Sequence, residues 1–271
     1  MKHLLWLWLL LALAACSAQP APPPALPVAP APTLLQIGIV SSAAPLIPLI
    51  EATYVQQNPQ VSLQFVQANS AALLADLDSG LLDAVLLHTI PAGDRRYFNP
   101  VALDGLVFIV HPENPIANLT IAEVQAIFNG RITNWQSLGG ANLPIVLLSR
   151  EQGSGLRTLL RQHIMAEQRI DPNALLQTGD EAMGTAVANT PAAIGYSSMS
   201  SASQSPVKML PIDGRSATPR TTADQTYPLT TPLYFLAATE DEPTGELRAF
   251  LAWLQSDEGQ AVVGVVYGRV R

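Results

Sequence analysis

Short apolar runs alternate with amphipathic stretches along most of the chain. Runs with the length and composition of strands lie at 35–40, 61–66, 82–87 and 103–110. Helical periodicities separate the first three runs, at 45–58 and 71–79, and Gly80 follows the second helix where a C-terminal cap is expected. Apolar strands that alternate with helices predict a mostly parallel sheet covered by helices on both faces. We therefore expect an α/β fold.

The second half of the chain continues this alternation. Thr120 and Glu123 have the spacing of a capping box, which predicts a helix that runs to about Phe128. An apolar run at 144–148 precedes a glycine turn and a helical stretch to about residue 168. A strand at 234–238 then precedes an amphipathic helix at 245–256. No segment repeats with a period of about 20 to 50 residues, which excludes a solenoid.

The N-terminus has the pattern of an export signal. The apolar run 4–15 follows Lys2 and His3, is too short to span a bilayer as a helix, and has the length of a signal-peptide core. It ends in Leu13-Ala14-Ala15-Cys16, which resembles the lipobox of bacterial lipoproteins, and Cys16 is the only cysteine of the chain. We expect 1–16 to be a lipoprotein signal peptide with Cys16 as the lipidated residue. The alternative is an ordinary signal peptide with an incidental cysteine.

A proline-rich segment separates this signal from the rest of the chain. Residues 17–33 consist largely of proline and alanine, cannot bury a core, and predict an extended linker. The residues that follow contain no apolar stretch long enough for a transmembrane helix and have the length of two lobes. We expect a monomer that a lipid anchor holds on the extracytoplasmic face of the cell membrane.

Composition and motif content exclude several classes of function. The formal net charge of −7 argues against nucleic acid as a partner. The sequence contains no CxxC, HExxH, GxSxG or P-loop pattern, and its four histidines lack the spacing of metal ligands. No nucleophile, base and orienting group combine into a catalytic set. We therefore expect no metal, no cofactor and no enzymatic activity.

The turn after the run 144–148 has the features of an anion site. A strand, a glycine-containing turn and a helix N-terminus leave backbone N–H groups without partners at the positive end of the helix dipole. Arg150 would add a planar set of donors that matches a tetrahedral oxyanion. Arg157 falls in the first helical turn, where a cation is unfavourable unless an anion is near. The alternative is a surface turn in which Ser154 caps the helix and both arginines are solvated.

Four segments, in order, resemble the phosphate-binding proteins of bacterial ABC transporters. They are the helix and turn Leu119 to Gly140, the turn Arg150 to Gly155, the segment Thr190-Pro191-Ala192-Ala193-Ile194-Gly195-Tyr196, and the return strand Tyr227 to Tyr234. The resemblance implies a two-lobed periplasmic-binding-protein fold, in which each lobe has a mostly parallel sheet flanked by helices and two strands cross between the lobes. It assigns 34–110 and 230–271 to lobe 1, and 111–229 to lobe 2.

The resemblance also implies a ligand and a partner. The ligand contacts of the family fall on Ser41 and Ser42 in one lobe, and on Arg150, Ser154 and Gly155 in the other. The implied function is the capture of a small oxyanion, with phosphate as the expected ligand, for the permease subunits of an ABC transporter. Closure of the two lobes around the ligand would be a hinge motion.

Three positions depart from the pattern of this family. Leu156 stands where threonine is common, and Leu87 and His88 stand where serine and aspartate are frequent. His88 can donate to an anion, and we include it among the candidate ligand-binding residues; the alternative is an ordinary loop histidine. These departures leave open a second function, a non-transport sensor or interaction module with the same fold and weak or no anion binding.

Overall fold

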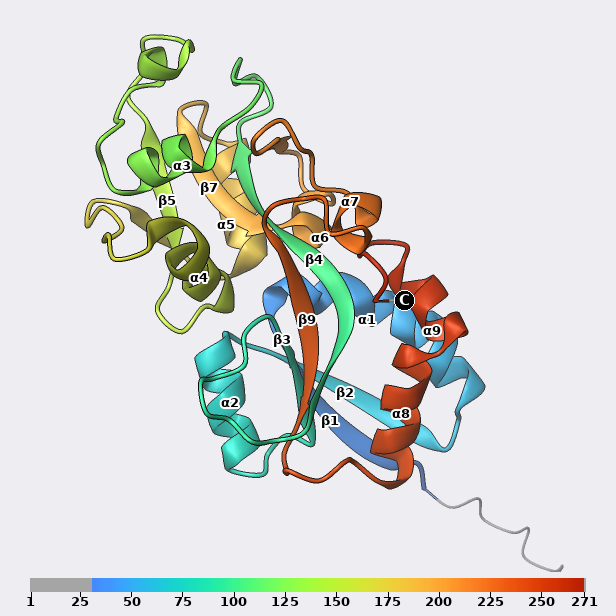
Figure 1. Ribbon diagram of the computed structural model, residues 1–271. Helices are drawn as coiled ribbons and strands as arrows, with labels where there is room; N and C mark the ends of the chain where they lie inside the picture. The colour runs from blue at the N-terminus through green and yellow to red at the C-terminus, as the bar shows by residue number, and fades with distance from the viewer. Residues whose placement is uncertain (1–30, 271) are drawn as a thin grey trace, which may run out of the picture. The chain divides into compact units, whose positions relative to one another are not determined.

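The computed structural model describes residues 31–270, and its strands join in one continuous path (Figure 1). The strands are β1 (Thr33–Ile39), β2 (Val61–Gln67), β3 (Ala84–Leu87), β4 (Phe98–Val110), β5 (Val146–Arg150), β6 (Leu175–Gln177), β7 (Ala193–Ser198), β8 (Lys208–Leu210) and β9 (Thr230–Ala237). Their order is β2-β1-β3-β9-β4-β7-β5-β6, and β8 pairs with β4 beside this path. Helices flank the strands, which confirms the predicted α/β fold.

The helices are α1 (Ile47–Ile50), α2 (Ser70–Asp78), α3 (Ile121–Phe128), α4 (Gly155–Leu160), α5 (Gly179–Ala188), α6 (Met199–Ala202), α7 (Pro219–Ala223), α8 (Gly245–Gln255) and α9 (Asp257–Val263). Of these, α1, α2, α3, α4 and α8 begin close to where the sequence predicts a helix, whereas α5, α6, α7 and α9 were not predicted. The capping box of Thr120 and Glu123 is present at the start of α3. A π-helical turn, Arg161–Met165, extends α4, so the predicted helix to about residue 168 ends earlier.

The helix predicted at 45–58 is built from three different pieces. A 3₁₀ turn at Ser41–Leu46 leads into α1, and a π-helical turn follows at Glu51–Val55. Pro45 and Pro48 have no N–H group to donate, so they interrupt a regular α-helical ladder at this point. The early start of the 3₁₀ turn places Ser41 and Ser42 at the N-terminus of the whole helical segment.

Two long strands, β4 and β9, run side by side through the middle of the structure (Figure 1). They pair antiparallel with each other, and β4 continues into antiparallel pairs with β7 and β8. The parallel pairs lie to either side, in β2-β1-β3 and in β7-β5-β6. The sheet is therefore mixed rather than mostly parallel, because the chain passes from one lobe to the other along β4 and returns in the opposite direction along β9.

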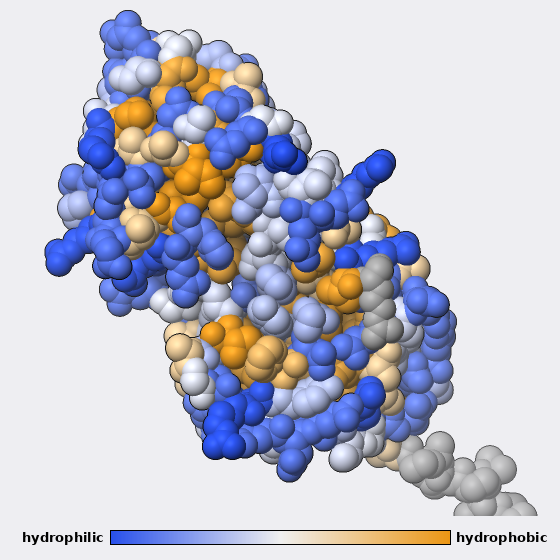
Figure 2. Space-filling view, viewed as in Figure 1, coloured by the Kyte–Doolittle hydropathy of each residue, from blue (hydrophilic) through white to orange (hydrophobic). Residues whose placement is uncertain are grey.

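The buried apolar side chains form two separate cores. One core takes residues from Leu35 to Ala102 and again from Leu233 to Tyr267, and the other takes residues from Leu106 to Leu229. Pale, weakly polar residues gather on the visible surface where the two lobes meet (Figure 2). The junction between the two lobes, through which β4 and β9 pass, therefore has a weakly polar surface.

The export signal and most of the linker lie outside the described residues. Cys16 and the segment 1–16 belong to this part of the chain, so the lipobox stays a prediction. The predicted linker ends inside the described part, since Thr33 already belongs to β1. In residues 31–270 no helix has both the length and the apolar character needed to cross a membrane.

Candidate functional site

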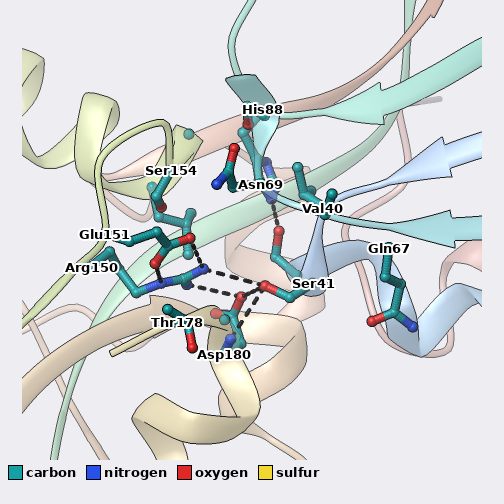
Figure 3. A pocket seen from close by; sticks show the side chains of 16 residues that line it. Val40, Ser41, Gln67, Asn69, His88, Arg150, Glu151, Ser154, Thr178 and Asp180 are labelled. Atoms are coloured by element: carbon teal, nitrogen blue, oxygen red, sulfur yellow. Dashed lines mark hydrogen bonds and ion pairs between the residues drawn. The ribbon is translucent and has the colours of Figure 1, made fainter. Parts of the chain in front are cut away.

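A cavity of about 260 Å³ opens between the two cores, and side chains of both lobes line it (Figure 3). All six residues selected from the sequence lie on its wall: Ser41, Ser42, His88, Arg150, Ser154 and Gly155. We call this cavity the ligand pocket. Its size, below the usual range of roughly 300 to 1,000 Å³ for pockets of drug-sized molecules, suits a small ligand.

Four helical segments begin at the ligand pocket. The 3₁₀ turn starts at Ser41, α2 at Ser70, α4 at Gly155 and α5 at Gly179. The N–H groups of a first helical turn have no partner within the helix and carry partial positive charge. The pocket therefore presents several positive helix ends toward a common space, which favours an anion.

Arg150 is the permanent cation of the ligand pocket. It ends β5, its side chain is only 4% exposed, and the hydroxyl of Tyr196 accepts a hydrogen bond from its backbone N–H at 3.0 Å. Its Nη1 lies 3.1 Å from Oδ2 of Asp180, and its Nε lies 3.1 Å from Oε2 of Glu151. Burial disfavours the charged guanidinium, but these two carboxylates outweigh the burial and raise the pKa of Arg150. The cation stays charged and is already paired with two carboxylates.

Asp180 is a residue of the pocket that the sequence analysis missed. Its Oδ2 accepts a hydrogen bond from the hydroxyl of Ser41 at 2.5 Å, and its Oδ1 accepts one from the hydroxyl of Ser197 at 2.6 Å. The contact with Ser41 joins residues 139 positions apart and connects the two lobes. Its only local signal is an aspartate in the first turn of α5, and this is an ordinary feature of helix N-termini.

Ser70 is the second residue that the sequence analysis missed. Its hydroxyl oxygen is buried without a hydrogen-bond partner among the described residues, and the residue is 5% exposed. The hydroxyl points at the turn before α4, because a Cβ atom added at Gly155 would lie 2.8 Å from it. Glycine at 155 thus permits the close approach of α2 to α4. A buried hydroxyl without a partner is unfavourable and indicates a group that a ligand would satisfy.

His88 joins the pocket to the strands that cross between the lobes. Its Nδ1 lies 3.2 Å from the carbonyl oxygen of Pro232 on β9, and its Nε2 lies 2.9 Å from the hydroxyl of Ser42. Because a carbonyl oxygen only accepts, Nδ1 carries a proton and donates to Pro232. Asp104 on β4 is also on the Nε2 side, at 4.0 Å. A catalytic triad would need the carboxylate on the other ring nitrogen.

Asp104 is fully buried where β4 and β9 connect the two lobes. Its carboxylate accepts hydrogen bonds from the hydroxyl of Ser200 at 2.7 Å and from the backbone N–H of Gly105 at 2.7 Å. Burial raises the pKa of Asp104, against the opposing effects of His88 and of the hydrogen bonds. Residues of β4 and α6 thereby meet His88, which follows β3, in one polar cluster beside the ligand pocket.

The remaining positions singled out in the sequence have structural roles. Leu87 and Leu156 are buried in the two cores, with exposed fractions of 0% and 3%. Arg157 does not line the ligand pocket; its Nη1 donates to the carbonyl oxygen of Arg150 at 2.5 Å. The partner of Arg157 is thus a neutral backbone carbonyl, and an anion beside Arg157 stays a prediction. Ser154 caps α4 through Arg157 N–H, as the surface-turn interpretation expects, and it also lines the pocket. The same interpretation expects both arginines to be solvated, which is wrong for Arg150 because its side chain is buried.

Comparisons with known proteins agree with this geometry. The sequence profile of the PBP superfamily domain matches residues 27–258. Over 232 residues, the chain is 26% identical to the phosphate-binding protein PstS of Bacillus subtilis. The aligned region covers 83% of this chain and 76% of that protein. A solved structure of a putative phosphate ABC transporter substrate-binding protein from Clostridium perfringens, with bound phosphate, superposes with a TM-score of 0.81 at 26% identity and covers 88% and 100% of the two chains. An ABC-type phosphate transport receptor from Vibrio cholerae superposes with a TM-score of 0.69 at 26% identity, over 88% and 99% of the chains.

Proposed function

The chain belongs to the PBP superfamily, and on this basis we propose that it captures phosphate and delivers it to an ABC transporter. The similar proteins carry the names of phosphate-binding proteins and of phosphate transport receptors. They bind and transfer a solute without changing it, and the protein described here is likewise a binding protein and not an enzyme.

One observation carries this proposal, the buried guanidinium of Arg150 among donors that come from both lobes. Ser41, Ser42 and His88 approach the ligand pocket from one lobe, and Ser154 and Gly155 approach it from the other. Hydroxyl groups, backbone N–H groups and a guanidinium together match the many acceptor positions of a tetrahedral oxyanion. We propose that these six residues hold the ligand and that the unpartnered hydroxyl of Ser70 joins them.

Ligand binding would couple to closure of the lobes. The donors are divided between two cores that β4 and β9 connect, so an anion that contacts both sets favours the closed arrangement. A hinge in a few residues of these two strands is sufficient for such a motion. The proposed division into two moving lobes is 34–110 with 230–271, and 111–229. Residues 106–110 already pack in the core of the second lobe, so the structure favours a limit between Ala102 and Leu106 on β4.

The anchor and the location are also part of the proposal. We propose that Cys16 is lipidated, that the linker 17–33 holds the body outside the cytoplasmic membrane, and that the protein acts there as a monomer beside its permease. The apolar run 4–15 that ends at Cys16 supports this assignment.

Calorimetric titration of the purified chain with phosphate, arsenate, sulfate and molybdate tests the proposed ligand. We expect saturable binding of phosphate with one site per chain. A titration in which none of the four anions binds would refute the proposed function.

A second candidate function is a sensor or interaction module that has lost tight anion binding. It is favoured by the two carboxylates of Glu151 and Asp180, which already occupy donors of Arg150. Under this alternative the same titration gives weak or no binding, although the fold and its thermal stability are intact.

A further inference from the structure

We propose that Arg157, Arg161 and Arg169 form an anion-collecting surface beside the ligand pocket, which accelerates the arrival of the oxyanion; this rests on the proposed function. The three arginines line one cavity of about 350 Å³, together with a single acidic residue, Glu167. Among residues 31–270, salt bridges involve other arginines and none of these three. We call the three residues the arginine surface.

The arginine surface is continuous with the edge of the ligand pocket. A further cavity is lined by Gln152, Gly153, Ser154, Arg157, Thr158 and Arg161. Ser154 also lines the ligand pocket, so the two spaces lie on either side of one turn. Arg161 follows Gly155 by six residues, and a helical rise of about 1.5 Å per residue places their backbones roughly 9 Å apart. This is close to the Debye length of about 8 Å at physiological ionic strength, so the charge is felt at the pocket edge.

The positions of these cations are unfavourable for the helix that carries them. Arg157 lies near the positive N-terminus of α4, and Arg161 follows it by four residues, where like charges face each other. Arg157 has a structural role, because it donates to the carbonyl oxygen of Arg150. Arg161 and Arg169 are exposed, and no hydrogen bond of their side chains is present in the described part of the chain that would explain their charge. Both side chains are therefore free to attract an anion from solution.

The approach of an anion to this chain would be faster with such a surface. The formal net charge of −7 repels an anion that approaches from a distance. Inside the ligand pocket, the single positive charge of Arg150 is paired with two carboxylates, Asp180 and Glu151. Unpaired cations beside the pocket reverse the repulsion locally and increase the rate at which oxyanions reach it.

Association kinetics test this role directly. Stopped-flow mixing with inorganic phosphate, followed by intrinsic tryptophan fluorescence, compares the wild-type chain with the double variant Arg161→Gln/Arg169→Gln. Arg157 is left intact because of its hydrogen bond to Arg150. The matched control is Arg95→Gln/Arg220→Gln, which changes the net charge equally at side chains that are 78% and 90% exposed and do not line the ligand pocket.

At an ionic strength of about 10 mM, we expect the association rate constant of the first variant to fall by roughly threefold to tenfold, with the dissociation rate constant unchanged. The control should fall much less, and at about 1 M salt the three proteins should become equal. An unchanged association rate constant, or an equal loss in the control, would overturn the inference; an acidic protein partner would then be the better occupant of the arginine surface. A faster dissociation that persists at high salt would overturn it too, because it indicates direct contact. If the wild-type chain binds no phosphate, the proposed function fails together with this inference.

Discussion

Replacement of Asp180 by asparagine is expected to change which oxyanion the ligand pocket prefers. The Asp180 carboxylate lies 3.1 Å from the Arg150 guanidinium, so an anion held by Arg150 lies within a few ångströms of a second negative charge. At a separation of about 5 Å and an effective dielectric constant of about 20, the repulsion is about 3 kcal/mol for each negative charge of the ligand. Sulfate carries no proton at neutral pH and experiences this repulsion in full. Protonated phosphate can donate a hydrogen bond to the carboxylate, which offsets about 1.5 to 3 kcal/mol.

In Asp180→Asn, sulfate affinity should therefore rise by about 1.4 to 2.7 kcal/mol, roughly 10-fold to 100-fold, while phosphate affinity changes little. Calorimetric titration with both anions at one pH and one ionic strength measures the ratio. Glu181→Gln is the matched control, because it removes the same charge from the next residue of α5, whose side chain is exposed. Thermal unfolding shows whether the variant keeps its fold. An unchanged ratio of sulfate to phosphate affinity in a folded variant would refute this reasoning.

Four further changes test other parts of the molecule. Arg150→Ala should weaken oxyanion binding by about 2 to 5 kcal/mol in calorimetry, and should also lower thermal stability because a buried carboxylate loses its partner; equal affinity in mutant and wild type would contradict the site. Ser70→Ala should weaken binding by about 1.5 to 3 kcal/mol without destabilising the unliganded protein, since its hydroxyl has no partner there; a lower melting temperature with unchanged affinity would contradict this. Because burial raises the pKa of Asp104, this carboxyl group favours the folded state most at low pH and loses that contribution as pH rises above about 4. The melting temperature of Asp104→Asn should therefore rise relative to that of the wild type when both are measured from acid to neutral pH. A difference in melting temperature that stays constant with pH would contradict this expectation. Cys16→Ser should abolish metabolic fatty-acid labelling and release the protein from the membrane fraction, and retained labelling would disprove the lipobox.

Local patterns were sufficient for most of the secondary structure. The apolar runs that became β1, β2, β3 and β4 and the amphipathic stretch of α8 are signals within single segments, and the structure places elements at each of them. The segment with Pro45 and Pro48 was harder, because its hydrophobic spacing is helical while its prolines divide it into three helix types. The antiparallel direction of β9 relative to β4 depends on the path of the chain between the lobes. The hydrophobic periodicity of a single segment carries no information about that path.

The site was predictable to the extent that its residues lie at strand-to-helix turns. Arg150, Ser154 and Gly155 stand in one such turn, and the resemblance to a family supplied Ser41 and Ser42. Asp180 and Ser70 were missed because their importance depends on contacts between distant parts of the chain. Asp180 meets Ser41 across 139 positions, and the hydroxyl of Ser70 is significant only because Gly155 leaves it space. Residues at a helix start, such as Ser70 and Asp180, can be assigned to the pocket only when the position of the neighbouring turn is known.

The order of the two cores along the chain has a consequence for biosynthesis. One core is contiguous, from Leu106 to Leu229, whereas the other needs segments from both sides of it. During synthesis, β3 emerges long before its antiparallel neighbour β9, so the first lobe keeps an open strand edge until nearly the whole chain has been made. The other lobe, whose core is contiguous in sequence, has no such delay. A nascent chain thus holds its first lobe incomplete until translation reaches β9.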